Sequence, residues 1–224
     1  MRSTTEWDER FPRGFGHTSI AFLRRCLGFI DAKNGDLNAA QFVVSRCVKL
    51  ERLQELREKY PEAVLLPVLG RNQLPLALSQ TIGLPIWLNV RLIHTVSRKA
   101  LCAMQRLMHR PMFTGYIRPD MNYILVDDVV TQGGTIAALR EFVLVQGGRV
   151  VAIVALAYAI GSQVIAPLRK HIVRLMVKFG MPLLLLLRIH GIIATFRELT
   201  NSQAKYLLRF ASLRNVDKKF TQVL

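Results

Sequence analysis

Residues 123–135 read YILVDDVVTQGGT, and this stretch decides the fold class. Tyr123–Val130 is an apolar run of strand length with two acids close to its end. After the Gly-Gly turn, Ile136, Leu139 and Val143 recur at helical spacing. The pattern predicts a buried strand that leads through a tight turn into a helix over 136–145. Ligands of open α/β sheets bind at the carboxyl ends of the strands, so this turn is the candidate site.

The same order of strand and helix recurs on both sides of this stretch. Ala63–Leu69 has the length and composition of a buried strand, and Leu74–Ile82 has the pattern of a helix with a proline in its first turn. Pro85–Val90 and Val150–Ala157 are predicted as further strands, and the second is wholly apolar. The repeated order predicts an α/β fold, with a doubly wound, mainly parallel sheet that is flanked by helices.

Three further helices are expected outside these units. One begins at Asn38, whose side chain is placed to cap it, and ends before Pro61. Val164–Phe179 carries apolar residues at helical spacing and basic residues between them. A last helix opens at Thr200 or Asn201 with the pattern of a capping box.

The chain has no recognisable linker or internal repeat. Met1–Lys33 shows no clear period and is expected to wrap over the core. We therefore predict a single domain over residues 1–224. Its core spans about 36–160, and a small hood is formed by the flanks 1–35 and 161–224.

The residue types of the turn suit a sugar phosphate. Two consecutive glycines let the backbone approach an anion, and amides at the start of a helix complement a phosphate. Thr131 and Thr135 add hydroxyl donors, while Asp127 and Asp128 are placed to accept from vicinal sugar hydroxyls. We expect both acids at an exposed strand tip. Since side chains alternate along a strand, one of them is alternatively structural, and such acid pairs also orient loops.

Positive charge dominates the chain, with 31 basic and 15 acidic residues and a net charge of +16. Residues 63–119 and 142–197 contain no acid at all. Such regions attract polyanions. A polyphosphate substrate, a nucleic acid and a solvated basic surface all agree with this distribution.

Cysteine and histidine indicate neither a disulfide framework nor a zinc site, because the three cysteines and five histidines are scattered along the chain. The longest apolar run, Met181–Leu187, is far shorter than the ~18 residues of a membrane span. Met1–Arg13 contains acids and lacks the apolar segment of a secretory signal. We expect a cytoplasmic protein without membrane association.

The stretch ILVDDVVTQGGT resembles the signature of the type I phosphoribosyltransferases: four hydrophobic residues, two acids, two hydrophobic residues and a turn rich in threonine and glycine. The resemblance implies that Asp127 and Asp128 hold the 2- and 3-hydroxyls of the ribose. It implies that the 5-phosphate is bound by Thr131, Gln132, Gly133, Gly134 and Thr135. Gln132 departs from the small residue or threonine usual in the family, but backbone donors are insensitive to that change.

Two more segments resemble functional loops of this family. Gly70, Arg71 and Asn72 follow a predicted strand and match the loop that binds diphosphate, where a guanidinium pairs well with phosphate oxygens. A solvated loop arginine is the alternative for Arg71. Residues 94–118 match the flexible catalytic loop, so its basic residues are candidates to contact the leaving diphosphate. These are Arg98, Lys99, Arg106 and Arg110.

The resemblance implies an enzyme of nucleotide metabolism. It would transfer ribose 5-phosphate from 5-phosphoribosyl-1-diphosphate to a nitrogenous base or related acceptor. Asp127, Asp128, Arg71, Arg98 and Lys99 are the predicted catalytic residues. Mg²⁺ is the expected cofactor, held by the two acids directly or only through ligand or water. A homodimer is also implied.

Other interpretations remain beside this one. The charge of +16 favours a regulator without catalysis that senses the diphosphate sugar and binds nucleic acid. A nucleotide-binding scaffold without turnover is a third possibility. No base-reading pattern is recognisable; Tyr158 is the nearest aromatic residue for stacking on a base, and core packing is its alternative role.

Overall fold

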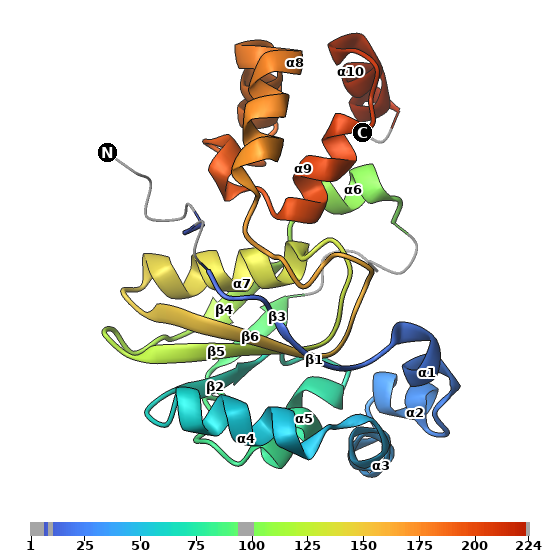
Figure 1. Ribbon diagram of the computed structural model, residues 1–224, viewed down its shortest axis with the longest axis vertical. Helices are drawn as coiled ribbons and strands as arrows, with labels where there is room; N and C mark the ends of the chain where they lie inside the picture. Colours follow the sequence, from blue (N-terminus) through green and yellow to red (C-terminus); the bar gives the residue numbers. More distant parts are fainter. Residues whose placement is uncertain (1–6, 9–10, 94–100, 223–224) are drawn as a thin grey trace.

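The computed structural model describes residues 7–8, 11–93 and 101–222 and contains a four-stranded sheet in which every neighbouring pair is parallel. Its strand order is β1 (Phe15–Thr18), β6 (Arg149–Tyr158), β5 (Asn122–Val130) and β2 (Val64–Pro67). Helices α3 (Leu37–Cys47), α4 (Leu50–Lys59) and α5 (Leu74–Ile82) lie on one side of the sheet, and α7 (Gly134–Val145) lies on the other (Figure 1). The predicted α/β fold class is confirmed.

Strand β5 runs through the middle of two apolar layers. Ile124 and Val126 pack into the layer shared with α3 and α5, while Tyr123 and Leu125 pack into the layer beneath α7. This alternation is the two-residue period of a strand that is buried on both faces. It explains why the motif strand is continuously hydrophobic until its two acids.

The predicted strand Pro85–Val90 is only partly present. Ile86 forms an isolated parallel bridge to Leu65, and beyond it the chain leaves the sheet. It continues into a separate antiparallel ribbon of β3 (Val90–Ile93) and β4 (Met112–Gly115). Trp87 packs against aromatic rings at this departure, and its indole N–H donates to the carbonyl of Tyr116. The apolar content of residues 85–90 alone does not show whether they pack as a strand of the sheet or, as here, through the Trp87 ring.

The N-terminal segment contributes an edge strand that its sequence does not predict. β1 pairs with β6, and Gly14, just before the strand, and Gly16 within it make room for a neighbouring ring. A Cβ added to Gly14 would lie 2.2 Å from the Tyr158 hydroxyl oxygen, and Gly16 also faces that ring. Two short helices follow, α1 (Ile20–Arg25) and α2 (Phe29–Lys33). The alternation that marks a strand is absent here because glycines occupy the positions that contact Tyr158.

The predicted long helix from Asn38 is two helices. Asp36, rather than Asn38, caps α3, and its carboxylate accepts the amide of Ala39 at 2.9 Å. Val48 and Lys49 are extended and separate α3 from α4. Both helices bury one apolar face, so the helical spacing of apolar residues continues from α3 into α4. This spacing therefore does not show that the helix is interrupted at Val48 and Lys49.

A helical layer lies beyond α7 and has an apolar cluster of its own (Figure 1). It contains α8 (Arg169–Ile189), α9 (Asn201–Leu208), α10 (Leu213–Thr221), the short 3₁₀ turn Phe196–Glu198 and α6 (Ala103–Met108). Among the described residues, no helix is long and apolar enough to cross a membrane. The assignment of the chain to one domain stays a prediction.

The C-terminal helices agree in part with the sequence. The predicted capping box at Thr200 is confirmed. The predicted helix 164–179 begins later, at Arg169, since Pro167 disfavours helical geometry at the residue before it. α8 also continues through a kink at Gly180, where φ is 58° and ψ is −150°. The sequence does not predict α10.

Candidate functional site

The candidate site lies at the carboxyl ends of β2 and β5, which are neighbours in the sheet. Pro67 pairs with Val126, and the amide of Val68 donates to the carbonyl of Val126 at 2.9 Å. The loop that begins at Gly70 therefore leaves the sheet beside the acid pair. Two segments that lie about sixty residues apart in the sequence thus meet at one edge, as ligand sites of open α/β sheets require.

The predicted phosphate turn connects β5 directly to α7. Gly133 is the N-cap of the helix and has φ of 75°, a left-handed conformation that favours glycine. The first amides of a helix have no partner within the helix, and its dipole favours an anion at this end. Thr131 is exposed, and Gln132 and Thr135 are partly exposed. The residues on either side of the two glycines are therefore accessible, while Gly133 and Gly134 themselves are buried.

The C-terminal segment holds this turn from outside. The hydroxyl of Ser162 donates to the carbonyl of Thr131, and the hydroxyl of Thr200 donates to the carbonyl of Gln132. A Cβ added to Gly133 would lie 3.2 Å from Cγ2 of Thr200. Ser162 and Thr200 are thus supporting residues that the motif did not identify, because they lie outside it in the sequence.

The two acids of the motif have different surroundings. Asp127 follows the face of Leu125, and its Oδ1 accepts the amide of Asp128 at 2.9 Å. Asp128 follows the opposite face and forms an ion pair with the ammonium of Lys33 from α2. The expectation of an exposed strand tip is wrong, since the acids are only 8% and 5% exposed. Lys33 from α2 lies against the end of the strand, a contact that the motif alone does not show.

The buried position of Asp127 also changes its pKa. Burial, and next the charge of Asp128, raise the pKa of Asp127 well above its ordinary value. The Lys33 ammonium opposes that rise without cancelling it. Burial thus makes the ionised form of Asp127 less favourable than that of an exposed carboxyl group.

Tyr158, the candidate for stacking on a base, is a packing residue. Its ring fills the space left by Gly14 and Gly16, and its hydroxyl donates to the carbonyl of Ile153 at 3.3 Å. Burial raises the pKa of Tyr158, and the charge of Asp127 adds to the rise. The alternative role in the core is therefore the one that the contacts favour.

The predicted diphosphate loop is open to solvent and is fixed to α2. Gly70 and Arg71 are exposed, and Oδ1 of Asn72 accepts the amide of Leu74 at the start of α5. Nε of Arg71 donates to the carbonyl of Asn34 at 3.0 Å. Arg71 is thus exposed, as the alternative of a solvated arginine expects, and its Nε also ties the loop to the end of α2.

Sequence reasoning did not identify Lys33, which the fold places beside the acid pair. It comes from a segment without a clear period, 95 residues before its partner Asp128. Nothing in the local pattern distinguishes it from other lysines, because only the fold brings α2 to the carboxyl end of β5. Its side chain is 22% exposed.

The basic residues of the predicted catalytic loop divide into two groups. Arg98 and Lys99 lie outside the described residues. Arg106 is on α6, in the helical layer. Arg110 forms an ion pair with Glu141 at 2.7 Å and donates to the carbonyl of Ile192 at 3.1 Å. Arg110 is therefore committed to contacts with α7 and the C-terminal segment.

The acid pair is a possible ligand set for Mg²⁺ only together with a substrate. Among the described residues, no group of three or more histidine, cysteine or acidic side chains could hold a metal ion. Asp127 and Asp128 supply oxygen ligands of the kind that Mg²⁺ prefers, but Mg²⁺ needs six ligands and commonly takes several from phosphates and water. The residues present fit an ion that arrives with a diphosphate.

Comparison with known proteins identifies two curated relatives. An uncharacterized protein of Haemophilus influenzae is 28% identical over 155 residues, which are 64% of this chain and 34% of the relative. Protein TraN of Escherichia coli is 30% identical over 146 residues, 59% of this chain and 32% of the relative. The matched segments thus make up about a third of the relatives' length. No protein-family model matches the chain.

The solved structures with a similar arrangement include three phosphoribosyltransferases. An adenine phosphoribosyltransferase is 18% identical with a TM-score of 0.37, covering 55% of this chain and 72% of its own. A purine phosphoribosyltransferase of Pyrococcus horikoshii is 21% identical with a TM-score of 0.34, covering 54% and 72%. The adenine phosphoribosyltransferase of Saccharomyces cerevisiae is 18% identical with a TM-score of 0.35, covering 55% and 70%.

Proposed function

We propose that this chain binds 5-phosphoribosyl-1-diphosphate and transfers its ribose 5-phosphate to a nitrogenous base or related acceptor. The observation that carries the proposal is the edge formed by β2 and β5. There a buried acid pair, a glycine turn at the start of α7 and an exposed Gly-Arg loop lie together. These groups are complementary to a ribose diol, a phosphate and a diphosphate.

The proposed reaction breaks the bond between ribose C1 and the diphosphate oxygen and forms a bond from C1 to the acceptor nitrogen. Asp127 and Asp128 orient the ribose by accepting from its hydroxyls. Amides of residues 132–135 hold the 5-phosphate, so the reacting carbon is fixed between the two anchors. Arg71 stabilises the negative charge that grows on the leaving diphosphate. Mg²⁺, when bound with the substrate, would neutralise part of that charge.

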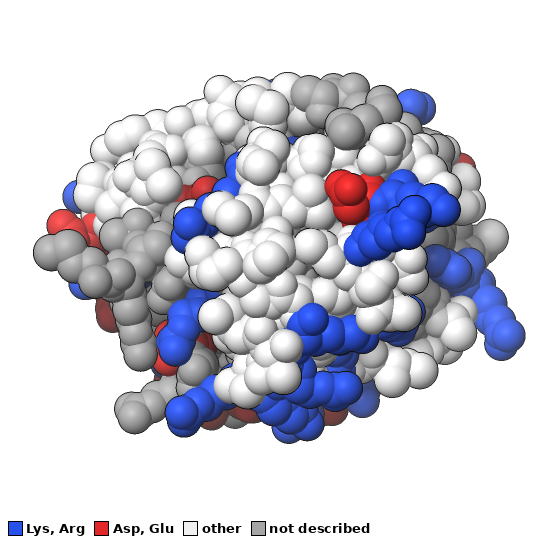
Figure 2. All heavy atoms as spheres, turned by 90° about the horizontal axis from the view of Figure 1, so that it is seen from above, with Lys and Arg blue, Asp and Glu red and all other residues white. Residues whose placement is uncertain are grey.

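A nucleic-acid-binding regulator that senses the same sugar is the second candidate. Figure 2 shows clusters of basic side chains and little acidic surface on the face seen from above. Exposed basic residues of the helical layer include Arg169, Lys170, Arg174, Lys178, Lys205, Arg209, Arg214 and Lys218. Such charge supports polyanion binding, although no nucleic-acid-binding motif is present in the sequence.

Isothermal calorimetry with 5-phosphoribosyl-1-diphosphate and Mg²⁺ tests the proposal. Asp128→Asn should weaken binding by about 1–3 kcal/mol, the scale for removal of a charged hydrogen-bond partner. Asp217→Asn, on the exposed side of α10, is the matched control and should bind as the unmodified protein does. A screen for diphosphate release in the presence of free bases then tests turnover. Absence of binding by the unmodified protein contradicts the proposal.

A further inference from the structure

The end of α2 bridges the two halves of the proposed site. Lys33 contacts the ribose acid Asp128, while the carbonyl of the next residue, Asn34, accepts from Arg71 in the diphosphate loop. The carbonyl of Ala32 accepts the amide of Gln73 at 3.0 Å at the other end of that loop. Three consecutive residues therefore join the acid pair to the loop. A cation at this position lies between the places proposed for the ribose and for the diphosphate.

The ion pair of Lys33 is poorly suited to be only a stabilising contact. The Asp128 side chain is 7% exposed and that of Lys33 is 22% exposed, so both charges lose much of their hydration. Buried ion pairs of this kind often recover little more than this loss. Ribose hydroxyls that bind Asp128 would also take hydrogen-bonding capacity that Lys33 now uses. The ammonium would then need a new anionic partner.

We propose that Lys33 is a substrate-binding residue that selects for the diphosphate of the sugar. The proposal rests on the function proposed above. In the free protein its ammonium neutralises Asp128. When the ribose diol binds Asp128, the flexible lysine side chain turns to the diphosphate that Arg71 and the Gly70 loop hold. After the exchange the oxygens of Asp128 accept from the ribose hydroxyls, and the ammonium adds a positive charge next to the leaving group.

The test compares two ligands that differ only in the diphosphate. Calorimetry measures the dissociation constants of 5-phosphoribosyl-1-diphosphate and of ribose 5-phosphate for the full chain and for Lys33→Met. We expect the variant to bind the diphosphate sugar about tenfold or more weakly, the scale for a hydrogen bond to a charged group. Its affinity for ribose 5-phosphate should change by less than about threefold on the same scale. Lys33→Arg should recover most of the difference, because it restores the charge.

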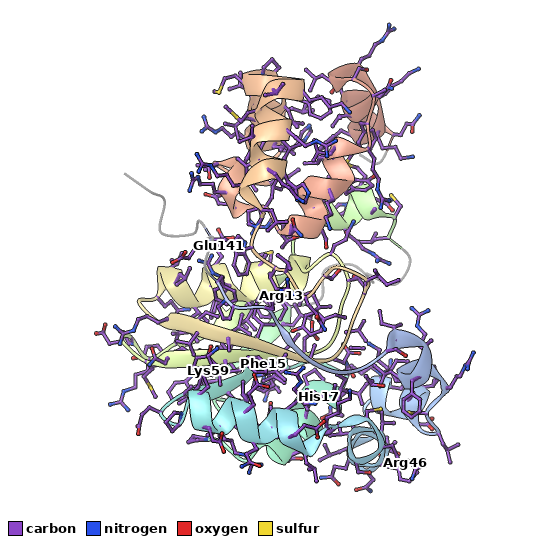
Figure 3. All side chains as sticks on the ribbon, viewed as in Figure 1. Arg13, Phe15, His17, Arg46, Lys59 and Glu141 are labelled. Atoms are coloured by element: carbon purple, nitrogen blue, oxygen red, sulfur yellow. The ribbon has the colours of Figure 1, made fainter. Side chains whose placement is uncertain are left out.

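Lys59→Met is the matched control. Like Lys33, Lys59 lies at the end of a helix with its ammonium over an aromatic ring. The Lys59 ammonium is 5.4 Å from the centroid of the Tyr60 ring, and the Lys33 ammonium is 5.7 Å from the centroid of the Phe29 ring. It is exposed and lies on α4, away from α2 (Figure 3). The control should bind both ligands as the unmodified protein does. If Lys33→Met does not fold, as judged by its melting curve, Lys33→Gln replaces it and keeps a hydrogen bond to Asp128.

The outcomes separate this inference from the function on which it rests. Equal weakening of both ligands means that Lys33 only positions Asp128, and tighter binding by the variant means that Lys33 blocks the site; either result overturns the inference alone. Failure of the unmodified protein to bind either ligand overturns the proposed function as well.

Discussion

Asp127 and Asp128 are adjacent, yet the fold gives them separate tasks. Asp128 has a cation beside it, whereas Asp127 is enclosed and uses one oxygen to accept the amide of its neighbour. A fold that merely needed to fill this position would place an apolar residue there, since burying a carboxyl group costs stability. The buried carboxyl group of Asp127 therefore lowers stability, and ligand binding is the role that we propose for it.

Replacing Asp127 with asparagine should raise stability at neutral pH. The raised pKa means that the unfolded chain ionises first as pH rises above 3.8, so the free energy of unfolding falls until the pKa of the folded state is reached. The penalty is about 1.4 kcal/mol for each unit by which the pKa is raised. Asp127→Asn does not titrate and keeps an acceptor for the Asp128 amide. Urea unfolding at pH 4 and pH 7 should show that the variant becomes more stable relative to the unmodified protein as pH rises; a constant difference contradicts this.

His17 should make the protein sensitive to acid. It is buried on β1, its Nδ1 accepts the amide of Lys49 at 3.3 Å, and its Nε2 has no hydrogen-bond partner within the described part of the chain (Figure 3). Burial first, and then the charges of Arg52 and Lys49, lower the pKa of His17 from 6.5 to about 4. Since the unfolded chain takes up the proton first, stability is lost as pH falls from 6.5 to about 4.

The size of the His17 effect follows from the same pKa. The interval from 6.5 to about 4 corresponds to about 3 kcal/mol, at about 1.4 kcal/mol per unit. His17→Gln keeps an acceptor for Lys49 and does not titrate. The difference in unfolding free energy between pH 7.5 and pH 4.5 should therefore be smaller in the variant. His171, whose pKa burial also lowers, is present in both proteins, so its contribution cancels.

At the scale of elements, the sequence predicted the regular units well and their irregular neighbours poorly. β5, α5 and α7 follow directly from period, proline and glycine signals. β1 does not, because Gly14 and Gly16 are needed only where the chain packs against Tyr158, 140 or more residues later in the sequence. The sequence did not predict the position of Lys33 for the same reason, because its contact with Asp128 joins segments that are 95 residues apart. Local sequence patterns predict local geometry. Contacts between residues far apart in the sequence, such as Lys33 and Asp128, depend on how the elements pack.

The contact between α9 and the phosphate turn yields a prediction for Thr200. Its hydroxyl donates to the carbonyl of Gln132 and accepts the amide of Gln203, so it both caps α9 and holds the turn. Thr200→Val keeps the shape and removes both hydrogen bonds. Removal of the cap should cost about 1 kcal/mol of stability, and a loosened turn should weaken binding of ribose 5-phosphate severalfold.

Ser212→Ala is the control for Thr200. Ser212 caps α10 through the amide of Asn215 at 3.4 Å and contacts no part of the turn in the described structure. It should lose a comparable amount of stability without a change in ligand affinity. If both variants bind ribose 5-phosphate normally, the hold of α9 on the turn has no role in binding. Gly133→Val is a less selective probe, because its side chain would strain the backbone and meet Thr200.

For the molecule as a whole, the net charge of +16 raises the question of which ligand its basic residues bind. Arg98 and Lys99 lie between the ribbon strand β3 and the helix α6 in the sequence, and their proposed task is to stabilise the leaving diphosphate. Changing both to glutamine should then depress turnover far more than it weakens ground-state binding of the substrate. Steady-state kinetics together with calorimetry measure both quantities. A loss of affinity without a loss of turnover would assign these residues to ground-state binding alone.

The helical layer offers the contrasting test, because its charge lies far from the motif along the chain. On α8, exposed Val173, Val177 and Leu185 accompany the basic residues, and such an apolar stripe is more typical of protein interfaces than of phosphate binding. We therefore expect weak, salt-sensitive binding of duplex DNA that the diphosphate sugar does not change. A triple variant neutralises basic side chains on the exposed side of α8: Arg169→Gln, Lys170→Gln and Arg174→Gln.

This variant separates the two candidate functions. If its side chains bind DNA phosphates, the log–log slope of DNA affinity against salt should shrink by about one unit for each phosphate that the variant no longer neutralises. Affinity for 5-phosphoribosyl-1-diphosphate should stay unchanged, because counterion release at α8 is independent of the turn at α7. Fluorescence anisotropy over a salt series measures the first quantity and calorimetry the second. Tight DNA binding that the diphosphate sugar modulates, without turnover on any base, would instead favour the regulator, since one ligand must then bind the two states of the protein differently.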